Sequence, residues 1–289
     1  MANVSAQKYY VPHGSQWPII GSISLFLIMF GTGMWLNDWG LGKLFVAGGA
    51  IAMLYMLFGW FGTVIGESVS GMFNKQVDTS FRMGMVWFIA SEVMFFAAFF
   101  GALFYVRHLA VPWLGGEGNN FWTNVLLWSG FESGWPSAGP ENLGGGFEPM
   151  AWNGLPLINT VLLLTSSVTI TIAHHALLRN DRFWLKLGLF LTFALGFAFL
   201  YLQVVEYAEA YQHLNLKLSS GIYGSTFFML TGFHGAHVTL GSIMLVVIWL
   251  RTLKGHFTPE HHFGFEGVAW YWHFVDVVWL GLFFFVYFL

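Results

Sequence analysis

Cysteine is absent from the 289 residues, and charged residues make up only 9% of them. Without a thiol the chain can form no disulfide, no CxxC zinc site and no thiolate copper site, and its redox compartment stays undetermined. Any metal site would have to use His, Asp, Glu or Met. Soluble domains carry about 25% charged residues. The low charge therefore excludes an ordinary soluble protein.

Basic blocks and nucleotide or hydrolase motifs are also missing. The net charge is −3 and no run of Lys and Arg occurs, so nothing indicates nucleic acid as a partner. The patterns GxGxxG, HExxH, GxSxG and the phosphate-binding P-loop are absent, which leaves soluble enzyme chemistry without support. No internal repeat is visible.

Apolar residues dominate what remains, at 56% of the chain, with aromatic residues at 20%. About 20 apolar residues cross a hydrocarbon core of about 30 Å. Segments of this kind cover residues 17–36, 43–66, 82–106, 155–178, 184–207, 222–250 and 263–288. The sequence therefore predicts an all-α integral membrane protein with seven transmembrane helices.

Basic residues decide the orientation, because an odd number of spans places the two ends on opposite sides. With the N-terminus inside, the cytoplasmic basic residues are Lys8, Lys75, Arg82, Arg179, Arg182, Lys186, Arg251 and Lys254. The outer ones are Lys43, Arg107 and Lys217. This excess inside predicts a cytoplasmic N-terminus and an outer C-terminus.

The polar link 67–81 is the candidate internal boundary. It divides an N-terminal region 1–66, with the first two helices, from a region 82–289 with the other five. The outer loop of about 109–154 is rich in Gly, Pro and Trp and carries four Glu residues without Lys or Arg. A solvated loop is favoured there over an acidic surface for a basic partner.

Glycine is abundant, at 35 residues, and many glycines lie inside the apolar segments. Gly31, Gly49 and Gly59 are examples, and Gly62 and Gly66 have the small-xxx-small spacing that lets helix backbones approach closely. We expect tight helix packing at these positions.

Glu92 is the only charged residue between Arg82 and Arg107. A charged acid at the centre of a membrane helix costs about 2.5 to 3.5 kcal/mol on insertion scales. We therefore expect Glu92 to be protonated, paired inside the protein, or both. Two roles fit: a proton-related group facing the bundle, or a neutral acid that bonds a neighbouring helix.

Histidines raise the question of haem or copper, since the chain has 11 of them. His234 and His237 share one face of the sixth segment, where an interhelical hydrogen bond to a carboxylate or carbonyl is favoured over metal ligation. His273 and Asp276 share a face of the seventh, either as a structural pair or as part of a proton relay. Interfacial positions at inner helix ends are favoured for the remaining pairs, His174 and His175, His261 and His262.

Four long blocks resemble subunit III of aa3-type cytochrome c oxidase. They read FRMGMVWFIASEVMFFAAFF, INTVLLLTSSVTITIAHHALL, GIYGSTFFMLTGFHGAHVTLGS and HHFGFEGVAWYWHFVDVVWL. Together they cover the third to seventh helices almost continuously, and WFGTVIGES at 60–68 extends the likeness more loosely into the first two.

The resemblance implies an accessory subunit of a proton-pumping respiratory oxidase, with a two-helix group and a five-helix bundle separated by a lipid-filled cleft. In this family haem a and copper belong to subunits I and II. The chain is therefore expected to have no catalytic centre or metal of its own, to bind phospholipid, and to meet cytochrome c only through the complex. It would stabilise subunit I and sustain proton uptake.

Individual positions follow from the same resemblance. Glu92 matches the buried carboxylate of the family's SEVxFF pattern, and the family's lipid-contacting residues match Trp60, Glu67, Arg251 and Lys254. The outer loop is longer than in the compact mitochondrial form. That favours a bacterial plasma membrane over the mitochondrial inner membrane.

Two alternatives remain. Quinol oxidases carry a related third subunit that usually lacks the first two helices, so their presence here favours the cytochrome c type. From the residues alone, the other class is a self-contained proton channel or transporter, with a relay of Glu92, His234, His237, His273 and Asp276.

Overall fold

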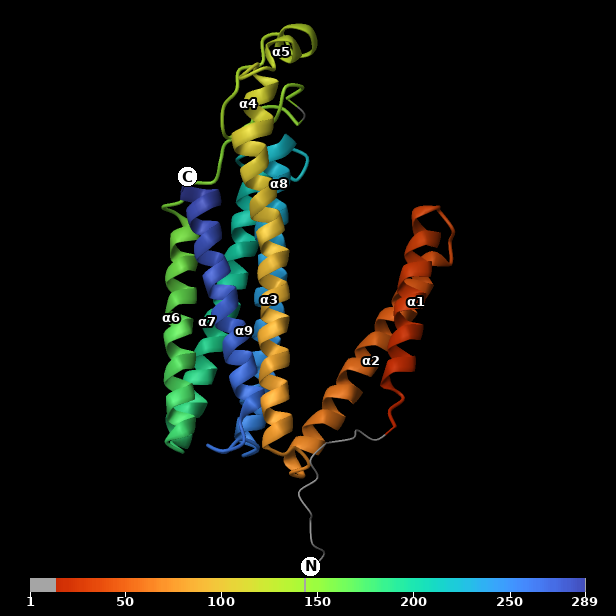
Figure 1. Ribbon diagram of the computed structural model, residues 1–289, viewed down its shortest axis with the longest axis vertical. Coiled ribbons are helices and arrows are strands. Elements are labelled where there is room, and N and C mark those ends of the chain that lie inside the picture. Colours follow the sequence, from red (N-terminus) through yellow and green to blue (C-terminus); the bar gives the residue numbers. More distant parts are fainter. Residues whose placement is uncertain (1–13, 143, 289) are drawn as a thin grey trace, which may run out of the picture. The chain divides into compact units, whose positions relative to one another are not determined.

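The computed structural model describes residues 14–142 and 144–288, and every regular element within those ranges is helical (Figure 1). Seven helices are long and apolar enough to cross a membrane. The predicted all-α architecture with seven spans is therefore confirmed. Lys8, which entered the orientation argument, lies outside the described residues.

The helices extend beyond several of the predicted apolar segments. The elements are α1 (Trp17–Leu36), α2 (Gly42–Val69), α3 (Lys75–Tyr105), the π-helical η1 (Val106–Ala110), α4 (Val111–Leu114), α5 (Phe121–Leu127), α6 (Leu155–Leu178), α7 (Arg182–Gln212), α8 (Gly221–Leu253), α9 (Phe263–Leu282) and the π-helical η2 (Phe283–Phe288). Hydropathy stops at the first polar residues, whereas a helix continues through them until its backbone groups find other partners.

The predicted polar link 67–81 is an example of this difference. Only residues 70–74 separate α2 from α3. The Asn74 side-chain oxygen accepts a hydrogen bond from the Val77 backbone N–H (3.0 Å), and Asp78 lies in the first turn of α3. Both features stabilise a helix start, so the segment from Lys75 onward is helical rather than a loop.

Two compact units make up the chain, residues 1–81 and 82–289. In the first unit, α1 and α2 pack against each other along small residues. A Cβ atom added to Gly31 would lie 2.7 Å from the Val46 nitrogen, and one added to Gly49 would lie 2.8 Å from Ile28 Cγ1. These glycines therefore allow backbone approach.

Gly62 and Gly66 correct the expectation from their spacing. A Cβ atom on either glycine would meet nothing within 4 Å. The buried positions of α2 are Gly42, Gly49 and Met56, which recur every seven residues and so form one face. Gly62 and Gly66 do not continue that series, so the close contact with α1 does not involve them.

The core of the second unit is a ring of four helices, in which α6 contacts α7, α7 contacts α8, α8 contacts α9, and α9 contacts α6. Trp272 of α9 lies at its centre, fully buried. A Cβ atom on Gly196 of α7 or Gly241 of α8 would come within 3 Å of the Trp272 ring. The indole N–H donates to Ser166 Oγ of α6 at 2.9 Å. One side chain thus joins all four helices.

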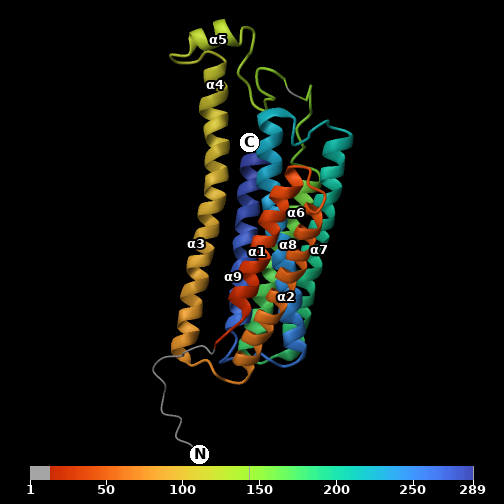
Figure 2. The same cartoon turned by 90° about the vertical axis from the view of Figure 1, so that its right-hand side faces the viewer.

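The long helix α3 flanks this ring (Figure 2). Its contacts with α8 and α9 are made by long side chains, including Phe95 with Phe233 (centroids 5.1 Å apart) and Phe96 with Phe274 (6.1 Å). The visible gap between the α3 ribbon and the ring is therefore bridged by aromatic rings.

Candidate functional site

Glu92 of α3 and His237 of α8 form a pair near the middle of their helices. Glu92 Oε2 lies 2.9 Å from His237 Nε2. The side chains are 21% and 14% exposed respectively, so the pair is largely shielded but not sealed. Two residues that are 145 positions apart in sequence are thus brought into direct contact.

The proton arrangement of this pair follows from the second ring nitrogen. His237 Nδ1 lies 2.6 Å from the Phe233 carbonyl oxygen, one turn earlier in α8. A carbonyl can only accept, so Nδ1 carries hydrogen and donates. Nε2 and Glu92 then share one further proton, which lies either on the carboxyl group or on the imidazole.

Aromatic residues surround the pair. The His237 ring lies 5.0 Å from Phe96 and 5.9 Å from Phe95, centroid to centroid, and 6.4 Å from Tyr271. Aromatic rings around an ionisable pair shield it from water, which strengthens the electrostatic attraction between its two groups. The arrangement is suited to fixing α3 against α8.

His234 lies one turn away in α8 but belongs to a separate contact. It is fully buried, and its Nε2 donates to the Val275 carbonyl of α9 at 3.1 Å. The ring packs against Trp279 and Phe199 at 5.1 and 5.7 Å. Both histidines of this face therefore make the interhelical hydrogen bonds that the sequence favours, one to a carboxylate and one to a carbonyl.

His273 and Asp276 are joined through a third residue rather than to each other. His273 Nδ1 lies 2.6 Å from Ser167 Oγ of α6, and the Ser167 side chain also lies beside the Asp276 carboxyl. Asp276 Oδ1 is buried and has no hydrogen-bond partner among the described residues. The five candidate groups thus fall into three separate sets of hydrogen-bond contacts.

Arg251 and Lys254 lie at the C-terminal end of α8 in the second unit. The Arg251 guanidinium carbon lies 4.5 Å from the centre of the Phe257 ring, while Arg182 Nη1 donates to the Phe257 carbonyl at 2.9 Å. Burial and the charges of Arg251 and Lys254 lower the pKa of His256. The neutral form of His256 is therefore favoured over the charged form.

Trp60 and Glu67 lie on α2 in the first unit. Trp60 is 47% exposed and stacks on Phe61, with centroids 5.6 Å apart. Glu67 lies in the last turn of α2, where its carbonyl accepts a hydrogen bond from Ser70 Oγ at 2.9 Å. An exposed aromatic ring and a nearby carboxylate at a helix end are suited to a membrane interface.

Two polar features of the second unit were missed from the sequence. Arg82 of α3 donates to Glu266 of α9 through both Nε and Nη2, each 2.8 Å from Oε2. Glu206 of α7 is fully buried and accepts from the Tyr287 hydroxyl at 2.6 Å. The position of Glu206 inside the predicted segment 184–207 was an available signal of a buried acid.

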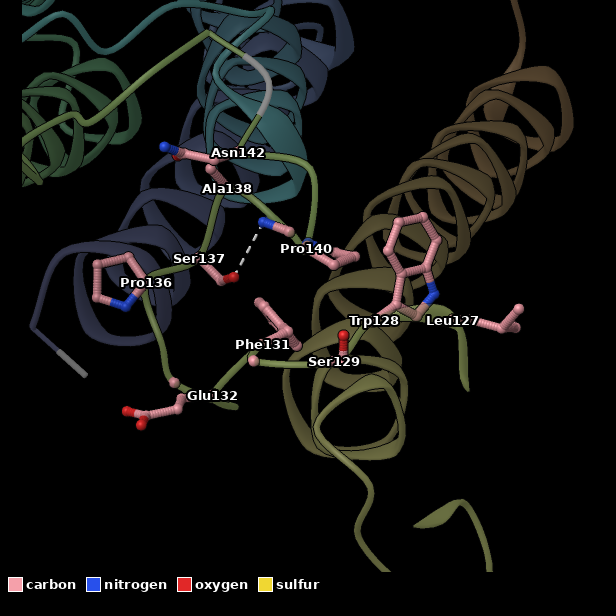
Figure 3. Close-up of a pocket in the computed structure, with 13 residues that line it drawn as sticks. Leu127, Trp128, Ser129, Phe131, Glu132, Pro136, Ser137, Ala138, Pro140 and Asn142 are labelled. Atoms are coloured by element: carbon pink, nitrogen blue, oxygen red, sulfur yellow. Dashed lines mark hydrogen bonds between the residues drawn. The ribbon is translucent and has the colours of Figure 1, made fainter. Parts of the chain in front are cut away.

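The long loop between α4 and α6 forms an open pocket of about 500 Å³, lined by residues between Leu127 and Asn142 (Figure 3). Ser137 Oγ accepts the Gly139 backbone N–H at 3.0 Å, and the Glu132 carboxyl points away from Ser129 and Ser137. No charged side chains converge there. In the ranges 14–142 and 144–288, no group of three or more His, Asp or Glu residues could hold a metal ion.

Comparison with known proteins gives a consistent result along almost the whole chain. The profile of the family described as Cytochrome c oxidase subunit III matches residues 7–289. Cytochrome c oxidase subunit 3 of Dugong dugon is 42% identical over 280 residues, with 96% of each chain covered. The proteins of the same name from Equus caballus and Oncorhynchus mykiss are each 41% identical, over 280 and 283 residues, with 96% and 98% of this chain and 96% and 97% of the relatives covered.

Proposed function

The chain belongs to the cytochrome c oxidase subunit III family, and from that premise we propose that it is the accessory, non-redox subunit of a proton-pumping oxidase that takes electrons from cytochrome c. The match through both units carries the proposal, because the two N-terminal helices are included. Haem a and copper would reside in subunits I and II. The oxidase chemistry would then depend on this chain indirectly.

The proposed contribution is mechanical and protonic. The Glu92 and His237 pair fixes α3 to the four-helix ring, so that α3 offers a stable apolar face to subunit I. Trp87 and Met94, seven residues apart on one face of α3, are examples of its exposed side chains. Proton-related roles for the pair, and for His234, His273 and Asp276, rest on their position inside apolar helices.

Phospholipid is the second proposed partner. An exposed Trp60 ring and Glu67 in one unit, and Arg251 with Lys254 in the other, have the chemistry of interfacial headgroup contacts. We place the chain in a bacterial plasma membrane with the N-terminus cytoplasmic and the C-terminus periplasmic. The charge asymmetry of the loops supports this orientation.

A self-contained proton channel receives no support, because the five candidate residues form three separate sets of hydrogen bonds instead of one relay. The test of the accessory role is oxygen consumption by the purified oxidase with and without this chain. The initial rate and the persistence of activity through repeated turnover are both recorded, and the chain is added back as the control.

We expect the stripped complex to start near full speed and then to lose activity early, with recovery of persistence on re-addition. Loss of activity from the first turnover, with the haems still in place, would contradict an accessory role. It would instead assign the buried acids and histidines a direct part in the reaction.

A further inference from the structure

Three polar side chains meet inside the second unit, away from the Glu92 and His237 pair, and a fourth is buried at the same level of the helices. They are Asn159 of α6, Gln203 and Glu206 of α7, and Tyr287 of η2, with exposures of 0%, 5%, 0% and 7%. Side chains of this kind are rarely buried to such an extent unless they have partners. Their burial therefore requires an explanation.

The helix register places Asn159 at the level of Gln203. Lower in the same antiparallel pair, Thr169 Oγ1 lies 2.8 Å from Thr192 Oγ1. Ten residues towards the outer end of α6 is Asn159, and eleven along α7 is Gln203. Asn159 also continues the buried face of α6 that includes Leu163 and Ser166, so it faces the interior.

Gln203 and Glu206 share a face of α7 three residues apart, and the Gln203 amide lies beside both the Glu206 carboxyl and the Tyr287 hydroxyl. Aromatic residues close the cluster on its inner side. Trp279 donates to Thr160 Oγ1 at 2.9 Å and packs 5.8 Å from the Tyr287 ring. Phe227 covers Tyr287 from α8 at 5.4 Å.

Most polar atoms of the cluster lack a protein partner. The Tyr287 hydroxyl donates to Glu206 Oε1 at 2.6 Å. Asn159 Nδ2 and Oδ1, Gln203 Nε2 and Oε1, and Glu206 Oε2 are buried and have no partner at hydrogen-bond distance and angle among the described residues, although the Gln203 amide lies near Glu206 and Tyr287. Each unpaired buried group costs about 1 to 3 kcal/mol of folding free energy. Leaving all of these groups unpaired would therefore strongly destabilise this part of the unit.

We propose that Asn159, Gln203 and Glu206 form an internal water-binding site. Two of the unpaired atoms are amide nitrogens that need acceptors, and three are oxygens that need donors. A water molecule supplies both functions and bridges two to four such groups. A metal ion would satisfy the oxygens and leave both amide N–H₂ groups unpaired, so the mixture selects water.

This site goes beyond the proposed function, since it concerns neither subunit contact nor phospholipid. Glu206 of this site lies three residues before Glu209, which is exposed near the C-terminal end of α7. Bound water would therefore solvate a buried carboxyl within reach of the outer aqueous phase.

The decisive experiment is a cryo-electron microscopy map of the complete oxidase at a resolution that shows ordered water, for the natural chain and for Gln203→Leu. We expect density about 2.7 to 3.2 Å from Gln203 Nε2 and Glu206 Oε2 in the natural chain, and loss of that density in the variant. Direct contact among the three side chains without density between them would overturn the proposal. So would one density that contacts only oxygens at metal-ligand distance.

Stability supplies a second, independent reading, with Ser242→Ala as the matched control. Ser242 Oγ is also buried without a described partner, but it stands alone beside Trp272 and Gly196. A hydrated cluster predicts that Gln203→Leu lowers the melting temperature of the chain within the complex by about 2 to 4 °C. In the cryo-electron microscopy map, Ser242→Ala should leave the density at Gln203 unchanged. A rise in melting temperature for Gln203→Leu would indicate a dry cluster and refute water binding.

Discussion

Helix α3 from Arg82 onward and the pair α6 and α7 belong to one unit but are held in opposite ways. Between α6 and α7 the backbones come close, and a Cβ atom on Gly188 would lie 2.9 Å from Ala173 Cβ and 3.0 Å from the Thr169 carbonyl. In contrast, α3 contacts its neighbouring helices through the ends of long side chains. Its polar attachments include Glu92 to His237 and Arg82 to Glu266.

The difference teaches that membrane helices can be fixed either by shape or by chemistry. Close packing of small residues gains dispersion energy over a continuous surface and tolerates no added atom. A helix held by a few polar and aromatic contacts has less buried contact area and opens at a lower free energy. We therefore expect substitutions to affect α3 through charge and to affect α6 and α7 through volume.

The largest effect is expected for Glu92→Lys. A Lys at the centre of a membrane helix costs about 2.5 to 3.5 kcal/mol, and it would replace the group that shares a proton with His237. We expect much less of the chain in purified oxidase, measured by quantitative mass spectrometry. The matched control is Glu92→Gln, whose amide can still donate to His237 Nε2 and should assemble nearly as well as the natural chain.

Equal recovery of the Lys and Gln variants would show that α3 does not depend on the chemistry of this pair. In that case the aromatic contacts of Phe95 and Phe96 would be sufficient to hold it.

The next largest effect tests the region fixed by shape. Gly188→Ala inserts a methyl group against the α6 backbone, and overpacking of this kind costs about 1 to 3 kcal/mol. Gly235→Ala is the same change in α8, where the added Cβ meets nothing within 4 Å. We expect a lower unfolding temperature of the complex only for Gly188→Ala. A similar decrease for both would mean that added volume between α6 and α7 is not the cause.

The smallest effect is expected in the N-terminal part of α3. Arg82→Gln removes the charge that pairs with Glu266, and the Arg82 side chain is 32% exposed. Partly exposed ion pairs contribute about 1 kcal/mol or less, and salt weakens them. The variant should therefore resemble the natural chain at high ionic strength, measured as thermal release of the chain from the oxidase. A salt-independent loss would indicate a packing role for the Arg82 stem instead.

The sequence was sufficient for the number and type of helices because each span is a long apolar run. It was also sufficient to single out Glu92 and His237, since polar groups inside such runs stand out. Their pairing could not be predicted, because nothing local specifies which of several buried histidines faces α3. Helix ends were underestimated where capping residues such as Asn74 extend a helix past its apolar part.

The glycine positions also show what could not be predicted from the sequence. Spacing alone pointed to Gly62 and Gly66, yet those glycines are open, while Gly188, Gly196 and Gly241 meet side chains from other helices. The face of a helix that contacts a neighbouring helix depends on the tertiary arrangement, which one sequence does not specify directly. Glu206 could have been singled out as an acid inside the apolar segment 184–207, but its contact with Tyr287 depends on the same tertiary arrangement.

The π-helical turn Val106–Ala110 interrupts the third span between α3 and α4. Such a turn contains one residue more than an α-helical turn, and each residue of an α-helix advances by about 100° around the axis. The number of residues in this π-helical turn thus sets the direction, around the helix axis, in which Val111–Leu114 and the following loop point. The half of α3 that carries Glu92 is not affected by it. Deleting one residue there would swing the outer loop about the helix axis while the contact with His237 stayed in register.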